Sequence, residues 1–373
     1  MQSPQTVPDA GSSGSACPPS RSGVSRPDPR FRTSSRPAAH AFRKAQAQGV
    51  ILPWIGRLSP WVLIAGLAYA AVFVKPSANG APLSQPVLER RDMFFGAAGD
   101  LDSLWVVGQD GAILHGVDGA TQWSREVLPT RTNLQAVAVS PAGVVVAVGN
   151  LGDLWLKAPG QAWSHAPLPV GEVGGKLLDV AFIDGHFWVS GEMGVLFRAG
   201  PDAGNWERLG DEQDVGFNAI RPGTGGDLWI AAEFGRLLRS RDGGQSWSTL
   251  ELGSESLRAV AFEGQVGVAV GNAGHAYVSR DGGDSWNAVA PFTTDHLHDV
   301  VVKEGLWSVV GDHGVYFQSR TPSEAWQDVA PAGLSKGYFT RVLPVAGGNL
   351  LVGQQLAMIE AGRLTVITAG GRP

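Results

Sequence analysis

Two segments of the chain carry carboxylates at a spacing that suits either acid–base chemistry or a tight turn. Residues 240–247 read Ser-Arg-Asp-Gly-Gly-Gln-Ser-Trp, and residues 279–286 read Ser-Arg-Asp-Gly-Gly-Asp-Ser-Trp. Each Asp can accept backbone hydrogen bonds of its own turn, and Gly permits a positive φ there. A third copy at 319–326 keeps Ser and Trp but has lost Asp and Gly. Because a reacting group would not tolerate that loss, the pattern favours a structural role for Ser240, Asp242, Gly244, Trp247, Ser279, Asp281, Gly283 and Trp286.

These turns belong to a repeat of about 40 residues, in which a strand-like run ends in a small residue, a short turn follows, and a Trp closes the unit. The small residues are Gly108, Gly149, Gly191, Ala232, Gly271, Gly311 and, in a copy without Trp, Gly353. Such a unit holds four short strands and cannot bury its own faces, so neighbouring units must stack, and a closed ring removes the unpaired edges. The sequence therefore predicts an all-β, seven-bladed β-propeller over residues 87–373.

Closure of this ring concerns the seventh unit. It has strand-like runs within Phe339 to Ile359 and Arg363 to Ile367, but no terminal Trp. Propellers usually complete one blade from both chain ends, so we expect Val87 to Phe95 to supply the missing outer strand. The alternative is an open β-solenoid, which would leave exposed edges and would need capping repeats.

The whole unit carries a family resemblance. The string LRAVAFEGQVGVAVGNAGHAYVSRDGGDSW at 257–286 resembles the repeats of the photosystem II stability and assembly factor propellers, and its turn matches the Asp-box of sialidases and other propellers. The resemblance spans roughly residues 90–360. It implies a non-enzymatic, seven-bladed propeller that holds membrane-protein partners during assembly, and, for relatives outside photosynthesis, an association with membrane exporters.

A carbohydrate-binding or sialidase-like glycoside hydrolase propeller is the alternative. Sialidases need an Arg cluster for the substrate carboxylate, a Tyr nucleophile with a Glu, and an acidic Asp. Outside residues 58–74 the chain has only Tyr277, Tyr316 and Tyr338, and the first two occupy apolar strand positions. Neither Phe-Arg-Ile-Pro nor a nucleophile elbow occurs, so no catalytic residue is expected.

Metal, cofactor and nucleic-acid sites are not expected either. The nearest metal candidate is the pair His296 and His298, yet the slot of His298 is taken in other units by Gln135, Leu178, Asn218, Arg258 and Thr340. The single cysteine, Cys17, has no partner for a metal-binding spacing. Phosphate binding requires a dense basic surface, and the chain after Arg57 is acidic. No obligatory small molecule is evident.

The N-terminal region differs from the repeat. Residues 1–53 are rich in Ser, Pro, Ala and Arg, which predicts a disordered basic tail. Residues 54–76 include the charge-free stretch LSPWVLIAGLAYAAVFV at 58–74, preceded by Trp54, which predicts a single transmembrane anchor. Residues 77–86 would form a linker. A cleaved signal peptide is the alternative, although Ala78 to Ala81 makes a poor cleavage site.

Charge predicts the orientation of this anchor. Up to Arg57 there are eight basic and two acidic residues, a formal +6, and the remainder of the −5 chain is then −11. By the positive-inside rule the tail stays in the cytoplasm and the propeller is exported. We therefore expect a single-pass protein of the inner (plasma) membrane with a periplasmic propeller.

Partner contacts are expected on one rim of the ring. If first strands begin on the face where second strands turn into third strands, these turns form a rim opposite the Asp-boxes. The second turn positions of three consecutive units would then form an apolar arc beside acidic residues. The alternative is that these residues are present only because polar residues beside Gly suit tight turns. The predicted partner-binding residues are Leu151, Glu192, Met193, Glu233, Phe234, Asn272 and Asp312. Together these features predict a membrane-anchored, non-enzymatic scaffold or assembly factor for a membrane-protein complex.

The orientation can be tested with a reporter that is active only outside the cytoplasm. A fusion after Pro373 should be active and a fusion near Val50 silent. Replacing Arg43, Lys44 and Arg57 by neutral residues should weaken this preference, because basic residues next to the segment dominate orientation. Activity at Val50 would contradict the predicted topology.

Overall fold

The computed structural model describes residues 52–73, 86–171 and 175–368. The chain divides into two units, Met1–Ala81 and Pro82–Pro373. In the first unit, α1 (Leu52–Phe73) is a helix of 22 residues that contains Pro60. No helix among the described residues is long and apolar enough to cross a membrane, so the anchor predicted at 54–76 has no support from the structure. Most of the predicted tail (1–53) and linker (77–86) lies outside the described residues.

The second unit contains seven antiparallel sheets of four strands each, which confirms the predicted seven-bladed propeller. Blades one to three comprise β1 (Phe94–Asp100), β2 (Ser103–Gly108), β3 (Ile113–Val117) and β4 (Gln122–Glu126); β5 (Leu134–Val139), β6 (Val145–Gly149), β7 (Leu154–Lys157) and β8 (Ser164–His165); β9 (Leu177–Ile183), β10 (His186–Gly191), β11 (Leu196–Ala199) and β12 (Glu207–Arg208). Blades four and five comprise β13 (Phe217–Pro222), β14 (Leu228–Ala232), β15 (Arg236–Ser240) and β16 (Ser248–Glu251); β17 (Leu257–Glu263), β18 (Val266–Gly271), β19 (Ala276–Ser279) and β20 (Asn287–Ala288). Blades six and seven comprise β21 (Leu297–Lys303), β22 (Leu306–Gly311), β23 (Tyr316–Thr321) and β24 (Ala325–Asp328); β25 (Phe339–Val345), β26 (Gly348–Gly353), β27 (Leu356–Glu360) and β28 (Arg363–Val366).

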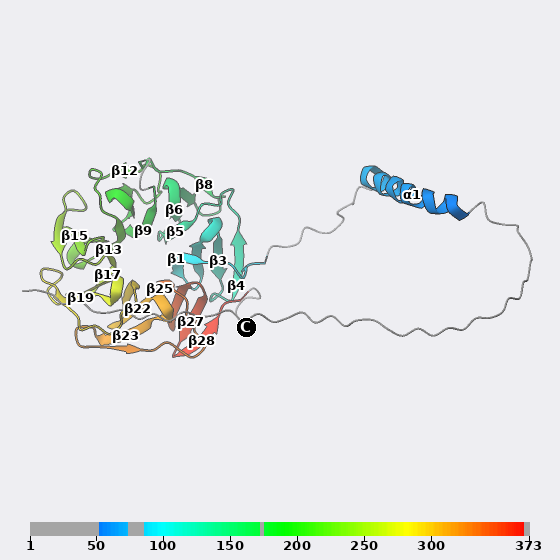
Figure 1. The fold of residues 1–373 in the computed structure, drawn as a ribbon. Coiled ribbons are helices and arrows are strands. Elements are labelled where there is room, and N and C mark those ends of the chain that lie inside the picture. The colour runs from blue at the N-terminus through cyan, green and yellow to red at the C-terminus, as the bar shows by residue number, and fades with distance from the viewer. Residues whose placement is uncertain (1–51, 74–85, 172–174, 369–373) are drawn as a thin grey trace, which may run out of the picture. The chain divides into compact units, whose positions relative to one another are not determined.

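The blades surround a central axis. Figure 1 shows β1, β5, β9 and β13 toward the middle of the ring, and β4, β8, β12 and β28 at its periphery. The first strand of each blade contacts the first strand of the next, and β1 contacts β25. Each first strand is also bulged at its start, as where Phe94 and Gly96 face consecutive residues of β2.

The predicted sharing of a blade between the two chain ends is wrong. Phe94 and Phe95 begin β1, the innermost strand of blade one, and blade seven forms its own fourth strand, β28. The reason is local. Ala361 and Gly362, both with positive φ, join β27 to β28 in a two-residue hairpin. Such a turn closes at a far smaller entropic cost than pairing with a strand at the other end of the domain.

The ring therefore closes through side chains. Phe94, Leu104 and Trp123 of blade one share a buried cluster with Leu350 and Met358 of blade seven. The Thr340 hydroxyl donates to the carbonyl oxygens of Phe94 and Phe95, at 3.3 and 3.1 Å. Neighbouring blades are packed in the same way elsewhere in the ring, by apolar side chains from facing sheets.

Tryptophans fill the outer part of the gaps between blades. Trp229 of β14 is fully buried, and its ring meets the ring of Trp286 edge-on with a centroid distance of 5.8 Å. Phe262 stacks on Trp229 at 5.1 Å, and the Arg239 guanidinium lies 4.9 Å from its ring centre. The box residues Trp247 and Trp286 are only half-buried, so they carry less of the packing than the sequence suggests.

We expect Trp229→Ala to destabilise the propeller by ~3–5 kcal/mol, because it leaves a large cavity between blades four and five. Trp286→Ala should cost less, because part of that ring is already in solvent. Urea unfolding of the full chain measures both. Trp61→Ala is the control, since this side chain is exposed on α1 in the other unit. Equal stability of Trp229→Ala and the parent protein would show that this packing is incorrect.

Candidate functional site

The turns between the second and third strands lie on one face of the ring, as predicted. In every blade the amide of the first turn residue donates to the carbonyl of the residue just before the first strand, as from Gln109 to Met93 at 2.8 Å and from Asn272 to Ser256 at 2.9 Å. Because this bond recurs in all seven blades, the turns form a rim around the start of the innermost strands. We call this face the rim.

Six of the second turn residues have a left-handed backbone. Their φ angles are 52–60° at Asp110, Leu151, Met193, Phe234, Ala273 and His313. This conformation costs an ordinary L residue roughly 1–2 kcal/mol, so bulky apolar residues are unusual there. Leu151 is 78% exposed and Phe234 is 55% exposed.

Met193 departs from the predicted arc, because it is half-buried. The loop at 211–214 lies against its turn: the Gln213 amide donates to the Met193 carbonyl at 3.1 Å, and the Gly194 amide donates to Val215 at 2.7 Å. The exposed carboxylates of Asp211, Glu212 and Asp214 stand on this loop. The structure therefore replaces a continuous apolar arc by two exposed apolar side chains with an acidic loop between them.

The predicted polar rim residues have local partners. Glu233 accepts the Gly216 amide at 2.8 Å, and Glu192 accepts the Lys176 amide at 3.3 Å. Asn272 accepts Arg258 Nε at 2.9 Å, and Asp312 lies 2.8 Å from His298 Nε2. These contacts fix the starts of the first strands, which is the ordinary turn role.

The second residues of the seven first strands line the mouth of the central channel. Together with Arg341 they enclose a cavity of about 140 Å³. These residues are Phe95, Gln135, Leu178, Asn218, Arg258, His298 and Thr340. The slot that the sequence showed to be variable is thus the channel lining. No group of three or more His, Cys, Asp or Glu in the described parts of the chain could hold a metal ion.

A buried ion network crosses the channel. Arg341 of blade seven lies 2.5 Å from Asp179 of blade three and 3.6 Å from Asp299 of blade six. Arg221 of blade four also pairs with Asp179. Asp179 and Asp299 are 1% and 2% exposed at their side chains. Burial raises the pKa of Asp299, and the charges of Arg341 and Arg221 oppose that rise.

Sequence reasoning missed this network, although a signal was present. The third position of the first strand is Gly or Ala in four blades, at Gly96, Ala136, Ala219 and Ala259. A charged residue at the same position in the other three blades breaks the repeat. What could not be foreseen was that the three charges meet, because Asp179 on blade three lies across the ring from Asp299 and Arg341 on blades six and seven.

Both Asp-boxes form hydrogen-bonded turns. Ser240 pairs with Leu228 at the start of β14, so the box lies at the end of the blade opposite the rim. Asp242 accepts the Ser246 amide at 2.9 Å and the Ser246 hydroxyl at 2.5 Å. The second box repeats these bonds around Asp281. At Gly244 φ is 86°, and an added Cβ would lie 2.4 Å from Trp188, so only Gly fits.

Hydrogen bonding lowers the pKa of both box carboxyls to about 2. The largest contribution at Asp242 is the Ser246 hydroxyl, and the largest at Asp281 is the Ser285 hydroxyl. Such a group remains ionised at neutral pH and cannot act as a proton donor there. The ionised carboxylates therefore hold the turns of the boxes together.

Comparison with known proteins agrees with this architecture. The family model described as Photosynthesis system II assembly factor YCF48 matches residues 157–333. The photosystem II assembly protein Ycf48 of Thermosynechococcus vestitus is 31% identical over 144 residues, which cover 37% of this chain and 41% of that protein. The photosystem II assembly lipoprotein Ycf48 of Synechocystis sp. is 32% identical over 139 residues, which cover 35% and 37%. The matched part thus spans less than half of either relative. The resemblance predicted from the repeat is confirmed.

Solved structures show the same fold. YCF48 bound to D1 peptide superposes with a TM-score of 0.59 at 18% identity, over 71% of this chain and 91% of that one. YCF48 from Cyanidioschyzon merolae gives 0.57 at 14% identity, over 71% and 94%. A catalytically inactive virginiamycin B lyase from Staphylococcus aureus with quinupristin gives 0.60 at 12% identity, over 75% and 96%. Since an enzyme shares the fold, the architecture alone decides no function.

The box carboxylates should make stability depend on acid pH. A folded pKa of about 2, below the ordinary 3.8, means that the ionised boxes stabilise the fold above about pH 4 and that this contribution is lost as the pH falls toward 2. The double variant Asp242→Asn/Asp281→Asn should therefore lose less stability than the parent between pH 5 and pH 2. Urea midpoints at the two pH values measure this.

The exposed Asp211 offers the control. Asp211→Asn should show the acid dependence of the parent, because this carboxylate makes no side-chain hydrogen bond to another described residue. If the double Asn variant falls as steeply as the parent, the boxes do not contribute as inferred.

Proposed function

We propose that this propeller is a non-enzymatic scaffold that assembles or stabilises a membrane-protein complex by holding a segment of a membrane protein on its rim. The proposal has two supports. One is the resemblance to photosystem II assembly proteins, among whose solved structures one carries a D1 peptide. The other is the chemistry of the rim.

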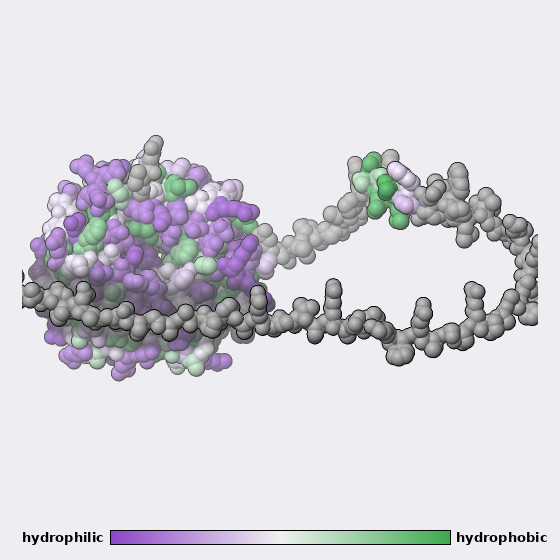
Figure 2. Space-filling view, viewed as in Figure 1, coloured by the Kyte–Doolittle hydropathy of each residue, from purple (hydrophilic) through white to green (hydrophobic). Residues whose placement is uncertain are grey.

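The observation that carries the proposal is the exposure of Leu151 and Phe234. Each stands at a strained turn position, where a small or polar residue would cost less, and each presents a large apolar side chain to solvent. Figure 2 shows a propeller surface that is mostly hydrophilic, with small separate hydrophobic areas. Apolar side chains held on a strained, rigid backbone are suited to contact a partner.

Charges around these side chains define the kind of segment they fit. Asp211, Glu212 and Asp214 lie between them, and Glu192 and Glu233 begin the turns of Met193 and Phe234. Arg236 lies 5.8 Å from the Phe234 ring centre and pairs with Glu251. The rim thus favours a segment with apolar anchors beside basic residues. Photosystem II D1 and the exporter partners implied by the resemblance are candidates for testing.

The tyrosines argue against the glycosidase alternative. A Tyr nucleophile needs a lowered pKa or an adjacent base. Burial instead raises the pKa of Tyr277, Tyr316 and Tyr338. Tyr316 is 2% exposed, and the Tyr338 hydroxyl donates to the sulfur of Met93 at 3.0 Å. We therefore retain the non-enzymatic assignment.

An exported location belongs to the proposal as well. Its support is the charge asymmetry of the sequence, +6 up to Arg57 and −11 after it. Attachment to the membrane through residues 54–76 remains a prediction, for which the reporter fusions are the test. Binding to the rim can be measured independently of location.

The test replaces the apolar rim residues. In the full chain, Leu151→Ser/Met193→Ser/Phe234→Ser should weaken capture of a membrane-protein segment at least tenfold, because two exposed anchors and one half-buried side chain are lost. A D1-derived peptide and detergent-solubilised membrane proteins are the two probes. Binding is measured by titration of the peptide, and bound membrane proteins are identified by mass spectrometry.

Two controls separate binding from folding. Ala273→Ser alters the same turn position in blade five, outside the proposed contact, and Asp242→Asn alters the opposite face. Both should bind like the parent. Undiminished binding by the triple Ser variant, with a parental melting curve, would refute the rim as the binding surface.

A further inference from the structure

The gap between blades six and seven contains a cavity of about 360 Å³. It lies at the end of the blades opposite the rim, where β21 turns into β22 and β25 turns into β26. Its volume falls within the roughly 300–1,000 Å³ that ligand pockets occupy. Because the cavity lies opposite the rim, it is separate from the proposed partner surface, and a ligand bound there would be independent of the proposed function.

The cavity exists because this gap lacks tryptophan. Each gap is filled by an inner slot on the second strand of one blade and an outer slot at the start of the fourth strand of the next. In order around the ring, the pairs of inner and outer slots are Trp105 and Trp163, Val146 and Trp206, Trp188 and Trp247, Trp229 and Trp286, Val268 and Trp326, Ser308 and Leu364, and Leu350 and Trp123. Of these seven gaps, all within the described residues, only that of Ser308 and Leu364 has no indole ring.

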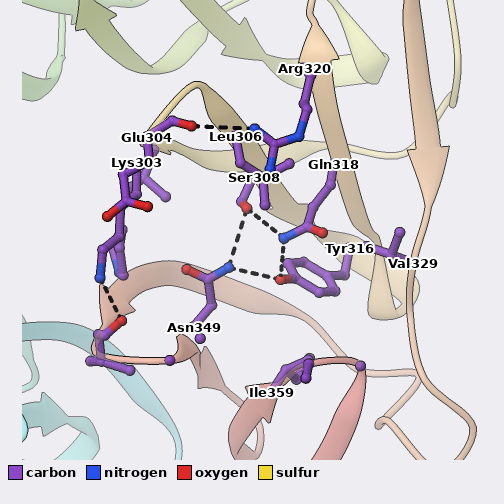
Figure 3. A pocket seen from close by; sticks show the side chains of 17 residues that line it. Lys303, Glu304, Leu306, Ser308, Tyr316, Gln318, Arg320, Val329, Asn349 and Ile359 are labelled. Atoms are coloured by element: carbon purple, nitrogen blue, oxygen red, sulfur yellow. Dashed lines mark hydrogen bonds between the residues drawn. The ribbon is translucent and has the colours of Figure 1, made fainter.

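Polar side chains take up part of the vacated space. The Gln318 amide donates to the Ser308 hydroxyl at 3.0 Å and to the Tyr316 hydroxyl at 2.8 Å. The Asn349 amide donates to the same two oxygens at 3.3 and 2.9 Å. Figure 3 shows the four side chains meeting in a closed ring of hydrogen bonds. Ser308 and Tyr316 are each 2% exposed and Asn349 is 9% exposed, whereas Gln318 is half-buried, so three of the four side chains lie in the protein interior.

This ring has unused acceptors. Neither the Gln318 nor the Asn349 amide oxygen accepts a hydrogen bond from another residue in the described ranges. Both oxygens lie open to the cavity or to solvent, because neither is among the fully buried side-chain atoms of the described residues that lack a partner. Two amide oxygens beside a cavity therefore offer acceptors to a bound molecule with an N–H or O–H group.

The residues that form the walls of the cavity indicate the polarity and charge of a ligand that would fit. They are mixed: polar side chains and glycines stand beside the aliphatic side chains of Val301, Leu306, Val329, Pro344, Val345 and Ile359. The charged lining residues are Lys303, Glu304 and Arg320. Lys303 Nζ donates to the Val345 carbonyl at 2.7 Å, and Arg320 donates to the Glu304 carbonyl at 3.3 Å. All three charged residues are exposed to solvent, so the interior of the cavity favours an uncharged ligand.

We propose that this cavity binds a small, uncharged, planar aromatic molecule with a hydrogen-bond donor on its edge. The neighbouring gaps show that the space between two blades at this level accepts indole rings, and here both slots hold smaller residues. The aliphatic side chains of the walls would cover the ring faces, and the free amide oxygens would accept the edge donor.

Free indole is the probe. Added to the full chain at increasing concentration, it should raise the melting temperature by at least about 2 °C once it exceeds its Kd severalfold. 1-Methylindole has the same ring without the N–H donor and should bind more weakly, by up to about tenfold. A cavity that holds only water would show no shift with either compound, and that result would overturn the proposal.

Two variants assign the effect to this gap. Ser308→Trp restores the residue found in blades one, three and four and should abolish the response to indole. Thr249→Trp adds an indole at an exposed outer-strand position and should respond like the parent. Gln318→Met, which removes one of the two amide acceptors while keeping a side chain of similar length, should narrow the difference in affinity between indole and 1-methylindole. An unchanged indole response in Ser308→Trp and Gln318→Met would place binding elsewhere and refute this site.

Discussion

The contact between blades one and seven is the constraint on which the rest of the propeller depends. Every blade supplies its own four strands, so no sheet is shared between the chain ends and the ring closes through side-chain packing and the hydrogen bonds of the Thr340 hydroxyl. Phe94 and Trp123 on one side meet Leu350 and Met358 on the other. Because β1 then contacts both β5 and β25, the innermost strands form a complete circle. The rim, the channel and the inter-blade gaps all exist as a result of that closure.

Within this frame, repeated positions serve structure and departures from the repeat create sites. The amide bond from each turn to the start of the first strand recurs in all seven blades and fixes the rim. Leu151 and Phe234 depart from it by placing large apolar side chains on a left-handed backbone. Ser308 and Leu364 depart from it because every other gap has a Trp in at least one of these two positions. Each departure leaves surface or volume that the repeat would otherwise have removed.

The charged network in the channel is a third departure, and its energetics differ. Replacing a buried ion pair by apolar residues is often neutral or stabilising, whereas removing one partner leaves an uncompensated buried charge. The ion pairs of Arg341 therefore contribute little to the net free energy of folding. Their main effect is to specify which blades face one another. Its guanidinium reaches Asp179 and Asp299, two blades that are not adjacent. In a ring with one blade fewer or one blade more, these charged side chains would be left without their partners.

The sequence by itself determined the number of blades, their four-stranded make-up, the face that carries the turns, and the hydrogen bonds that each Asp-box carboxylate accepts within its own turn. All of these follow from local periodicity and turn chemistry within one unit. The tertiary structure decided that β28 pairs with β27, that the loop at 211–214 partly covers Met193, that Arg341 meets Asp179, and that Ser308 and Leu364 fall in the same gap. The last two of these bring together residues from different units, and a repeat read one unit at a time does not contain that information. In the β28 hairpin, by contrast, a two-residue turn prevailed over a pairing expected from other propellers.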